Sequence, residues 1–397
     1  MKTIVEMIQL DKAFETVISS AFQTGSEVIP FNNSLNRILA EDIVTDTDMP
    51  SFNKSTVDGF ACRKEDINHE LELIETIPAG KVPAKRISVD QCSKIMTGAP
   101  VPSGADYVFM VEDSKVLGSG RIKCSGPVKK DNISKKGEDV REGKIVLRIG
   151  KQIRPQDIAV MASVGHTSVT VRKLPRVAII SSGNELVEPH EKPGQSQIRN
   201  TNAYQLLAQV KRAGGDGKYY GIARDDEEDT LTIINKAIAD CDLVLITGGV
   251  SMGDFDFVPS VLERAGVKIL FSKVAVQPGK PIIFGSHPEA LVFGLPGNPV
   301  SSFMQFELLV RPLISKMMGF QWQPIDVIFP MKERYTRRLS DRMALLPVVI
   351  TDEGFVVPVE FHGSAHISAL PGADGIIAIP VGKHTIEKGE QVSVRQI

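Results

Sequence analysis

The sequence predicts a multidomain protein with α/β and β parts, and three observations support this prediction. The chain has 397 residues, which is longer than one ordinary domain. From residue 174 onward, apolar strand-like runs alternate with helix-like segments, which is typical of a three-layer α/β domain with a mostly parallel sheet. Residues 51–143 and 325–397 hold short β-like runs between turn residues, which indicates two β-rich domains, the second small and barrel-like.

We therefore expect four domains. An elongated N-terminal domain of helix and strands is discontinuous in sequence and consists of residues 1–50 and 144–172. Residues 51–143 form a β-rich domain inserted into it, residues 173–323 form the central α/β domain, and residues 324–397 form the C-terminal β domain.

Two helices are predicted in the N-terminal domain. Residues 9–22 carry Phe14, Val17, Ile18 and Ala21 at helical spacing, so this segment is expected to be amphipathic. A short helix is expected to begin near Pro155 and to end at Gly165, between strands.

The strands of the α/β domain are predicted from continuous apolar runs. "RVAIIS", "LVLI" and "LVFGL" lack the alternation of a half-exposed strand, so we expect them to be buried on both faces of a parallel sheet, and "YYGI" is a further strand. In the C-terminal domain the predicted strands are "IDVIF", "ALLPVVI", "GFVVPVEF", "DGIIAIP" and "EQVSVRQI".

Four helices are predicted between these strands. One covers residues 201–213 and another carries Val258, Val261, Leu262 and Ala265 before Gly266. A third begins at Asp225 and Asp226, with Glu228 placed for a capping-box contact. The fourth begins at Asn298 as N-cap, with Pro299 in its first position.

The composition and charge of the chain argue against several classes of protein. A formal net charge of −2 argues against a nucleic-acid-binding protein. The first residues carry Glu6 and Asp11 where a signal peptide needs an apolar core, and no run of 18 apolar residues predicts a membrane span. The four cysteines are widely separated and predict reduced thiols rather than a disulfide framework or a zinc site. We expect a cytoplasmic enzyme.

Three predicted strands are followed by glycine-rich turns, at the edge where open parallel sheets bind ligands. The turns are "SSGNEL", "TGGVSMGDFD" and "GLPGNP". Glycine lets the backbone approach a ligand, although tight strand–helix turns also need glycine for themselves. The candidate binding residues of these turns are Ser182, Gly183, Gly248, Gly249, Ser251, Pro296, Gly297, Asn298 and Pro299.

Acidic residues follow the same strands and are expected to cluster at that edge. Mg²⁺ prefers one or two carboxylates together with phosphate oxygens, so the cluster indicates a metal-bridged phosphate. Helix capping is the alternative for each acid, and we favour capping for Asp226 and function for Asp256. The acids are Glu185, Asp225, Asp226, Asp254 and Asp256.

Basic and hydroxyl side chains complete the candidate site. Lys273 and Lys280 in "SKVAVQPGKP" are candidates for binding phosphate, with surface solvation as the alternative. In the inserted domain, the stiff loop "MTGAPVPSGAD" presents Thr97, unless it is only a surface hairpin. His362 and His366 have the spacing of a helical metal site but lie in a β-rich region, so we do not expect a metal there.

Together these stretches resemble the bacterial MoeA family of molybdopterin molybdenumtransferases and the E domain of gephyrin. The matching stretches run in family order over nearly the whole chain. They are "SFNKSTVDGFA", "TGAPVPSGAD", "GEDVREG", "RPQDIAVMASVG", "AIISSGNEL", "GGVSMGDFDF", "QPGKP", "GLPGNPVSS" and "GSAHISALPGADGIIAIP".

The resemblance implies the last step of molybdenum cofactor synthesis. Such enzymes take adenylylated molybdopterin and molybdate, release AMP with Mg²⁺, and place molybdenum on the dithiolene sulfurs. The resemblance also implies a homodimer whose site is shared between subunits, and the molybdopterin adenylyltransferase of the preceding step as a partner.

Site residues carry over by motif. The resemblance implies Asp58 and Thr97 from the inserted domain as catalytic, and Asp139 matches the acid of "GED". Asp225 and Asp256 are implied for Mg²⁺ and pyrophosphate. From the α/β domain the implied residues are Glu185, Lys273, Lys280, Pro296 and Pro299.

Two positions depart from the family pattern. Gln277 stands where some members have lysine, which leaves the predicted oxyanion site less positive. Asn184 replaces an aspartate of "SGDEL", which weakens any metal-ligand role there.

Three other functions remain open. The same α/β module could serve a molybdopterin adenylyltransferase or a nucleotide or pyridine-nucleotide hydrolase, although the inserted domain and the β tail argue against this. A gephyrin-like chain could be a scaffold for receptor peptides. A protein that stores molybdopterin or molybdate without turnover would bind the same molecules.

Overall fold

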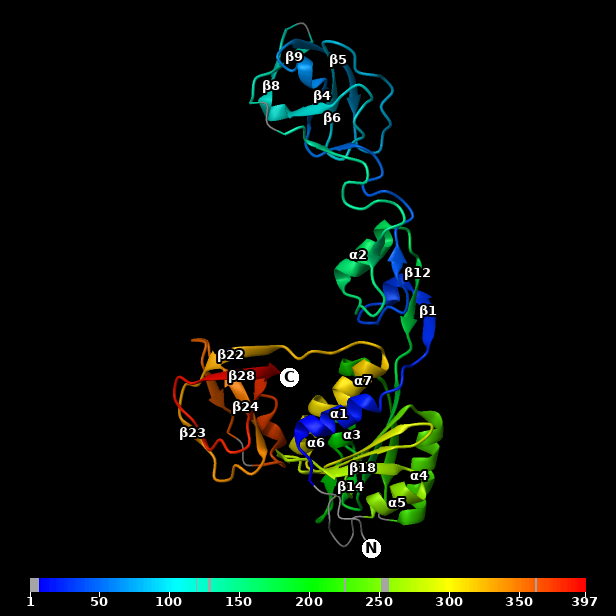
Figure 1. Cartoon of the computed structure of the whole chain (residues 1–397), viewed down its shortest axis with the longest axis vertical. Helices are drawn as coiled ribbons and strands as arrows, with labels where there is room; N and C mark the ends of the chain where they lie inside the picture. Colours follow the sequence, from blue (N-terminus) through cyan, green and yellow to red (C-terminus); the bar gives the residue numbers. More distant parts are fainter. Residues whose placement is uncertain (1–6, 119, 128–129, 225, 251–256, 361–362) are drawn as a thin grey trace. The chain divides into compact units, whose positions relative to one another are not determined.

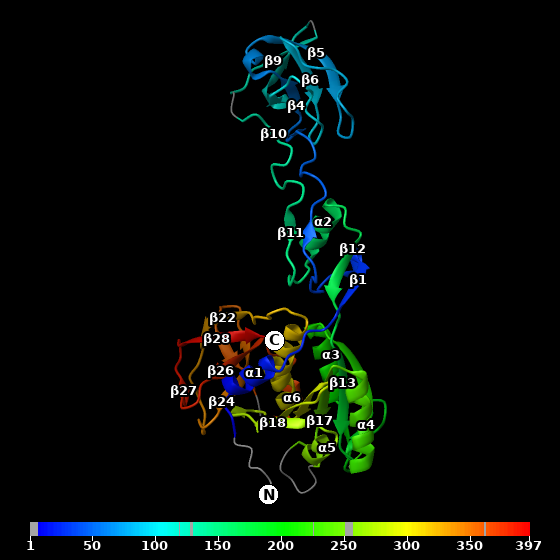
Figure 2. The same cartoon turned by 45° about the vertical axis from the view of Figure 1, so that its right-hand side comes forward.

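The computed structural model describes residues 7–118, 120–127, 130–224, 226–250, 257–360 and 363–397 (Figures 1 and 2). Within the chain, two compact units are described separately. Unit 1 contains residues 1–27, 36–38 and 171–397, and unit 2 contains residues 28–35 and 39–170. The finer division into four domains stays a prediction.

A six-stranded sheet forms the centre of unit 1. Its order is β16-β13-β17-β21-β20-β18, and the first four strands are parallel, whereas β20 and β18 run antiparallel to their neighbours. The expected mostly parallel sheet is thus present, with an antiparallel hairpin at one edge that was not predicted. The strands are β13 (Arg176–Ser182), β16 (Asp216–Ala223), β17 (Leu243–Thr247), β18 (Lys268–Lys273), β20 (Pro281–Ser286) and β21 (Leu291–Leu295).

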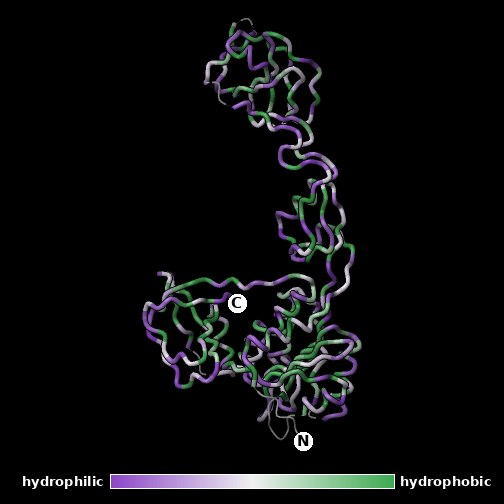
Figure 3. The backbone as a smooth tube through the Cα atoms, viewed as in Figure 1, coloured by the Kyte–Doolittle hydropathy of each residue, from purple (hydrophilic) through white to green (hydrophobic). Residues whose placement is uncertain are grey.

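Helices cover both faces of this sheet and give three layers. Val177 and Ile179 of β13 pack in one apolar cluster with α1, α3, α6 and α7, whereas Ala178 and Ile180 pack in another with α4 and α5. The central strands are accordingly hydrophobic over their length (Figure 3). The helices are α1 (Leu10–Ser19), α3 (Asn202–Ala213), α4 (Glu227–Asp240), α5 (Val258–Arg264), α6 (Pro299–Gln305) and α7 (Arg311–Met317), with a π-helical turn η4 (Phe306–Val310) between the last two.

The N-terminal helix differs from the prediction. It spans Leu10–Ser19 rather than residues 9–22, and it buries Ala13 and Val17. Phe14, predicted on the apolar face, is 41% exposed. The small Ala13 occupies the buried face instead, because the helix lies close against its neighbours.

At the starts of two predicted helices, the structure confirms one capping residue and changes the role of two others. The Asp226 carboxylate accepts a hydrogen bond from the Asp229 backbone N–H at 2.8 Å, so Asp226 caps α4 as favoured. Glu228 does not form a capping box, because its side chain pairs with Arg264 of α5. Asn298 occupies the N-cap position of α6, but its side chain makes no capping hydrogen bond.

A second six-stranded sheet follows in unit 1. Its order is β19-β24-β26-β28-β22, with β25 on β24, and its five C-terminal strands match the predicted runs. The parallel pair β19–β24 joins this sheet to the loop before β20. The strands are β19 (Val276–Gln277), β22 (Asp326–Pro330), β24 (Met343–Ile350), β25 (Val356–Pro358), β26 (Gly375–Ile379) and β28 (Gln391–Gln396); β23 (Tyr335–Thr336) pairs with β27 (Thr385–Ile386), and η5 is Ile367–Ala369.

Unit 2 contains the predicted β-rich insertion and a short helix. Its main sheet has the order β7-β4-β6-β5-β9-β8. The helix α2 (Pro155–Ser163) begins at Pro155 as predicted. The strands are β4 (Gly59–Cys62), β5 (Glu70–Ile77), β6 (Gln91–Ile95), β7 (Tyr107–Met110), β8 (Ser114–Val116) and β9 (Arg121–Cys124).

Shorter elements complete the description. None of the helices in the described part of the chain combines the length and apolarity that crossing a membrane requires. The remaining elements are β1 (Ser26–Pro30), η1 (Phe31–Asn33), β2 (Ile43–Val44), β3 (Lys54–Ser55), η2 (Lys64–Asp66), η3 (Val111–Asp113), β10 (Ile133–Ser134), β11 (Ile145–Leu147), β12 (Ser168–Arg172), β14 (Leu186–Val187) and β15 (Ile198–Arg199).

Candidate active site

The three predicted glycine turns meet at one edge of the central sheet. β13, β17 and β21 are parallel neighbours, so their carboxyl ends lie side by side. The Gly248 N–H donates to the Leu295 carbonyl at 3.1 Å, which ties the second turn to the third. A Cβ added to Gly297 would lie 3.6 Å from the Gly248 Cα, so these two backbones are in contact.

Backbone geometry explains the first two glycines of the middle turn. Gly248 has φ +96° and a Cβ there would collide with the Ser182 carbonyl oxygen. Gly249 has φ +65°, and its Cβ would lie 2.7 Å from the Val258 Cγ2. The turn itself therefore requires these glycines. Gly297 has no such constraint, so the turn itself does not require glycine there, and close approach of a ligand is the alternative reason.

Asn202, at the start of α3, joins two of these turns. Its amide Nδ2 donates to the Thr247 hydroxyl at 2.7 Å and to the Gly297 carbonyl at 2.8 Å. The Thr247 hydroxyl in turn donates to the Pro296 carbonyl at 3.1 Å. Sequence reasoning did not select Asn202, although an asparagine at the first turn of a helix that opens beside a ligand edge is a usable signal.

Two polar atoms at this edge are buried without a hydrogen-bond partner among the described residues. They are the Ser182 hydroxyl and the Asn202 Oδ1. An unpaired buried polar group costs about 1–3 kcal/mol. A polar ligand or water at the edge would relieve that cost, so both atoms support a binding role for the edge.

The predicted acids fall into different surroundings. The Glu185 carboxylate is exposed and lies over Gly183, where an added Cβ would collide with it. Asp226 caps α4 and has a structural role. Asp225, Ser251, Asp254 and Asp256, which include the predicted Mg²⁺ ligands, lie outside the described residues.

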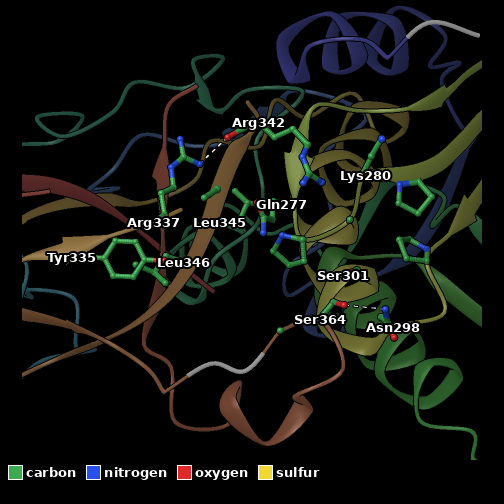
Figure 4. A pocket seen from close by; sticks show the side chains of 16 residues that line it. Gln277, Lys280, Asn298, Ser301, Tyr335, Arg337, Arg342, Leu345, Leu346 and Ser364 are labelled. Atoms are coloured by element: carbon green, nitrogen blue, oxygen red, sulfur yellow. Dashed lines mark hydrogen bonds between the residues drawn. The ribbon is translucent and has the colours of Figure 1, made fainter. Parts of the chain in front are cut away.

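The two predicted lysines, Lys273 and Lys280, also lie in different surroundings. Lys280 lines a cavity of about 560 Å³ between the loop before β20, the start of α6 and the C-terminal sheet (Figure 4). Lys273 ends β18 and is not among the lining residues. The lining residues are Gln277, Pro278, Gly279, Lys280, Pro281, Pro296, Asn298, Ser301, Tyr335, Arg337, Arg342, Ala344, Leu345, Leu346, Gly363 and Ser364.

The charge of this cavity is positive. Lys280, Arg337 and Arg342 line it, and no carboxylate is among its described lining residues. Lys280 is exposed and has no ion pair with a described residue. The Arg342 Nε forms an ion pair with the largely exposed Asp341 carboxylate at 3.4 Å. Such a cavity favours an anion.

Arg337 supports the cavity from within the protein. It is 8% exposed, and its guanidinium donates to the backbone carbonyls of Lys383, Arg342 and Pro380 at 2.8, 2.7 and 2.6 Å. These acceptors are neutral, so its charge is not cancelled, and one of them fixes the backbone of Arg342. Burial also raises the pKa of the lining Tyr335.

Asn298 and Ser364 close one side of the cavity. The Asn298 amide donates to the Ser364 hydroxyl at 2.9 Å (Figure 4). The Val300 N–H donates to the Ser364 carbonyl at 3.1 Å. The Ser364 carbonyl of the C-terminal segment thereby accepts a backbone N–H at the start of α6, where the Asn298 side chain was predicted to be the cap. Pro299 occupies the first position of the helix as predicted, and Pro296 lines the cavity.

In unit 2, Asp58 and Thr97 lie together. The Asp58 Oδ1 accepts hydrogen bonds from the Thr97 N–H at 2.6 Å and from its hydroxyl at 2.9 Å. These two bonds, the backbone bond first, lower the pKa of Asp58. Both residues are exposed, so the pair is available to a ligand. Asp139 is also exposed in this unit.

A metal-compatible group in the described residues lies elsewhere. Asp66, His69 and Asp90 in unit 2 place ligand atoms close to one another. The His69 Nδ1 contacts the Asp90 carboxylate at 2.6 Å, and the Asp66 carboxylate accepts the Asp90 N–H at 3.1 Å. These bonds satisfy the group internally. His366 does not belong to it, and His362 lies outside the described residues.

Three family models match successive parts of the chain. The MoeA N-terminal region (domain I and II) matches residues 8–165, the probable molybdopterin binding domain matches residues 178–316, and the MoeA C-terminal region (domain IV) matches residues 332–397. The described edge of the central sheet lies in the second match, and the cavity lies between the second and third.

Relatives and solved structures match over the whole chain. A molybdopterin molybdenumtransferase of Staphylococcus epidermidis is 35% identical, over 98% of this chain and 95% of the relative, and one of Staphylococcus aureus is 33% identical with the same coverage. Two crystal structures of a molybdopterin biosynthesis MoeA protein from Pyrococcus horikoshii have TM-scores of 0.83 and 0.86, at 33% and 31% identity. They cover 98% and 99% of this chain, and this chain covers 99% and 100% of them.

Proposed function

Because the chain belongs to the MoeA family of molybdopterin molybdenumtransferases, we propose that it inserts molybdenum into molybdopterin during molybdenum cofactor synthesis. The matches support this, since all three family regions are present in order and the relatives align over nearly their full length. The adenylyltransferase and hydrolase alternatives would use the α/β module alone.

The single observation that carries the chemistry is the cationic cavity between the central and C-terminal sheets. Molybdate is a compact dianion, and three basic side chains with no lining carboxylate suit such a ligand. We assign the molybdate site to this cavity. Lys280 and Arg342 contact the oxyanion, Arg337 fixes Arg342, and Gln277 contributes a neutral amide.

The second substrate is adenylylated molybdopterin, and we assign it to the edge formed by the three glycine turns. The unpaired Ser182 hydroxyl and Asn202 Oδ1 are available to hydrogen-bond it. Pro296 and Asn298 belong to both the edge and the cavity, so the two substrates would be adjacent. Adjacent binding is what transfer of molybdenum requires.

Release of AMP requires the phosphoanhydride charge to be neutralised. We assign Mg²⁺ to Asp225 and Asp256, and we assign Glu185 and Lys273 to the same phosphate-handling step. When bound, Mg²⁺ would neutralise developing phosphate charge. Asp58 and Thr97 would reach this site from the inserted domain of a second subunit, so the functional form is a homodimer.

The test follows AMP release from adenylylated molybdopterin with Mg²⁺, with and without molybdate. The transferase gives molybdate-dependent AMP release that Asp256→Ala abolishes. The matched control is Asp226→Ala, because Asp226 caps a helix and should leave the rate unchanged. Tight substrate binding with no AMP release under any condition would leave storage or scaffolding, and molybdate-independent release would favour a hydrolase.

The cavity assignment has its own prediction. Arg342→Gln should weaken molybdate binding roughly 10- to 150-fold, because a partly buried charge-assisted contact is worth about 1.5–3 kcal/mol. Isothermal titration calorimetry measures this directly. Arg338→Gln is the matched control, since Arg338 is exposed and does not line the cavity. Equal affinities in both variants would contradict the assignment.

A further inference from the structure

We propose that Gln305 is a positioning residue for molybdate, acting by holding the loop that presents Lys280. The proposal rests on the assignment of the oxyanion to the cationic cavity. Gln305 is the last residue of α6, does not line the cavity, and is absent from every motif of the sequence analysis.

Gln305 packs directly beneath the Lys280 loop. It is 0% exposed, and its Nε2 donates to the Gly279 carbonyl at 2.7 Å. A Cβ added to Gly279 would lie 2.8 Å from that same nitrogen, and Gly279 has φ +103°. The loop can therefore approach the amide this closely only because position 279 is glycine.

Backbone pairing holds the loop on both sides, and the Gln305 side chain holds it between them. On one side the Lys280 carbonyl accepts the Val274 N–H at 3.0 Å. On the other side Val276 and Gln277 pair with Met343 and Ala344 of β24. Between them, the Gln305 amide holds Gly279, the residue immediately before Lys280.

Loss of the hydrogen bond between Gln305 and Gly279 should displace the Lys280 ammonium group but leave its charge in place. Gly279 is buried, so its carbonyl would be left without a donor and the loop would shift to find one. The attraction of Lys280 for an oxyanion depends on their separation, so a displaced Lys280 binds it more weakly. Lys280 itself, and its charge, would be unchanged.

The chain offers a matched control in Gln209 of α3. Gln209 is 4% exposed, and its Nε2 donates to the Phe303 carbonyl at 3.3 Å and to Glu307 at 2.8 Å. Like Gln305, it has a buried Oε1 without a hydrogen-bond partner among the described residues. None of its partners lines the cavity. Gln209→Met therefore reproduces the loss of a buried amide without touching the loop.

The experiment is a double-mutant cycle read by calorimetric titration with molybdate. The proteins are wild type, Lys280→Ala, Gln305→Met, the double variant and Gln209→Met, with thermal melting of each. We expect Gln305→Met to weaken binding roughly 3- to 10-fold, Gln209→Met to change it less than about twofold, and the double variant to bind no more weakly than Lys280→Ala. If Gln305→Met does not fold, Gln305→Asn, one methylene too short to reach Gly279, replaces it with the same expectation.

Two results would overturn the proposal. One is equal affinity in Gln305→Met and Gln209→Met. The other is a double variant whose loss is the sum of the single losses, which would show that Gln305 does not act through Lys280. Unchanged binding in Lys280→Ala would instead refute the cavity assignment itself, so failure of the inference and failure of the proposed function are distinguishable.

Discussion

At the residue scale, an aspartate can cap a helix or bind a ligand, and its hydrogen-bond partners decide which role it has. Asp226 and Asp256 both follow strands in the α/β domain, and sequence reasoning separated them only by preference. The hydrogen bond from the Asp229 N–H assigns Asp226 to its helix. Asp256 lies outside the described residues and keeps its proposed metal role.

A stability measurement tests the capping role of Asp226. Asp226→Ala should lower the free energy of unfolding by about 1 kcal/mol, because one N–H of the first turn of α4 loses its acceptor. Urea unfolding followed by circular dichroism measures this. Asp226→Asn is the control, since asparagine also caps, and it should recover most of the loss. No loss in Asp226→Ala would contradict the capping role.

The Asp58–Thr97 pair gives a prediction about pH. Its two hydrogen bonds hold the pKa of Asp58 below the ordinary value in the folded protein. The stabilising contribution is therefore present above the unfolded pKa and is lost as pH falls through the folded pKa. Thr97→Val removes the hydroxyl donor but keeps the N–H, so the pKa should rise only partway toward 3.8.

Carboxyl NMR titration of wild type and Thr97→Val measures this shift. Ser103→Ala, in the same loop but without a side-chain bond to Asp58, serves as the control and should leave the Asp58 pKa in place. A pKa that is identical in Thr97→Val and wild type would show that the hydroxyl does not bind the carboxylate.

Single residues also mark where sequence reasoning reached its limit. The glycine turns, Lys280 and Thr97 were selected from short motifs with chemical meaning, whereas Asp58 was implied only by the family resemblance. Arg337 and Asn202 were not selected, since their hydrogen-bond partners lie far away in the sequence, and Arg342 was not, since only the fold brings it into the same cavity as Lys280. Lys273 was selected together with Lys280; Lys273 pairs with Pro281 in the β18–β20 hairpin, whereas Lys280 lines the cavity.

At the element scale, the turns after β17 and β21 place glycine under different demands. Gly248 has a left-handed φ and no space for a Cβ, whereas Gly297 has neither restriction. Gly248→Ala should therefore cost about 1–3 kcal/mol of stability or more, and Gly297→Ala should cost little. Chemical unfolding of both variants checks the contrast, and equal losses would contradict it.

Strands were easier to predict than their arrangement. The runs "RVAIIS", "LVLI" and "LVFGL" are apolar throughout because both faces of β13, β17 and β21 are buried. The β18–β20 hairpin, which pairs antiparallel at one edge of the sheet, was not predicted from the sequence. Helix ends followed local signals such as Gly214, but the buried face of α1 depended on tertiary packing.

At the scale of the whole molecule, the thiols report whether the fold is intact. Cys62, Cys92 and Cys241 are buried, and Cys124 is partly exposed. Burial raises the pKa of Cys92 to about 12 and also raises those of the other three thiols. The reactive thiolate is therefore scarce at every position.

Titration with a disulfide reagent tests this arrangement. We expect at most one thiol, that of Cys124, to react slowly in the native protein, and four to react after denaturation. Cys124→Ser is the control and should abolish the native reaction. Rapid reaction of two or more thiols before denaturation would show that the described packing around the buried cysteines is wrong.

The division of the chain between the two units bears on its synthesis. Helix α1 emerges first, yet its buried Ala13 and Val17 pack with α3, α7 and the central sheet, which lie beyond residue 170. At about 5–20 residues per second, the ribosome needs on the order of ten seconds or more to supply them. During that interval unit 2 can complete its fold, while α1 must wait with an apolar stripe exposed. Over that interval the apolar face of α1 is available to chaperones and proteases.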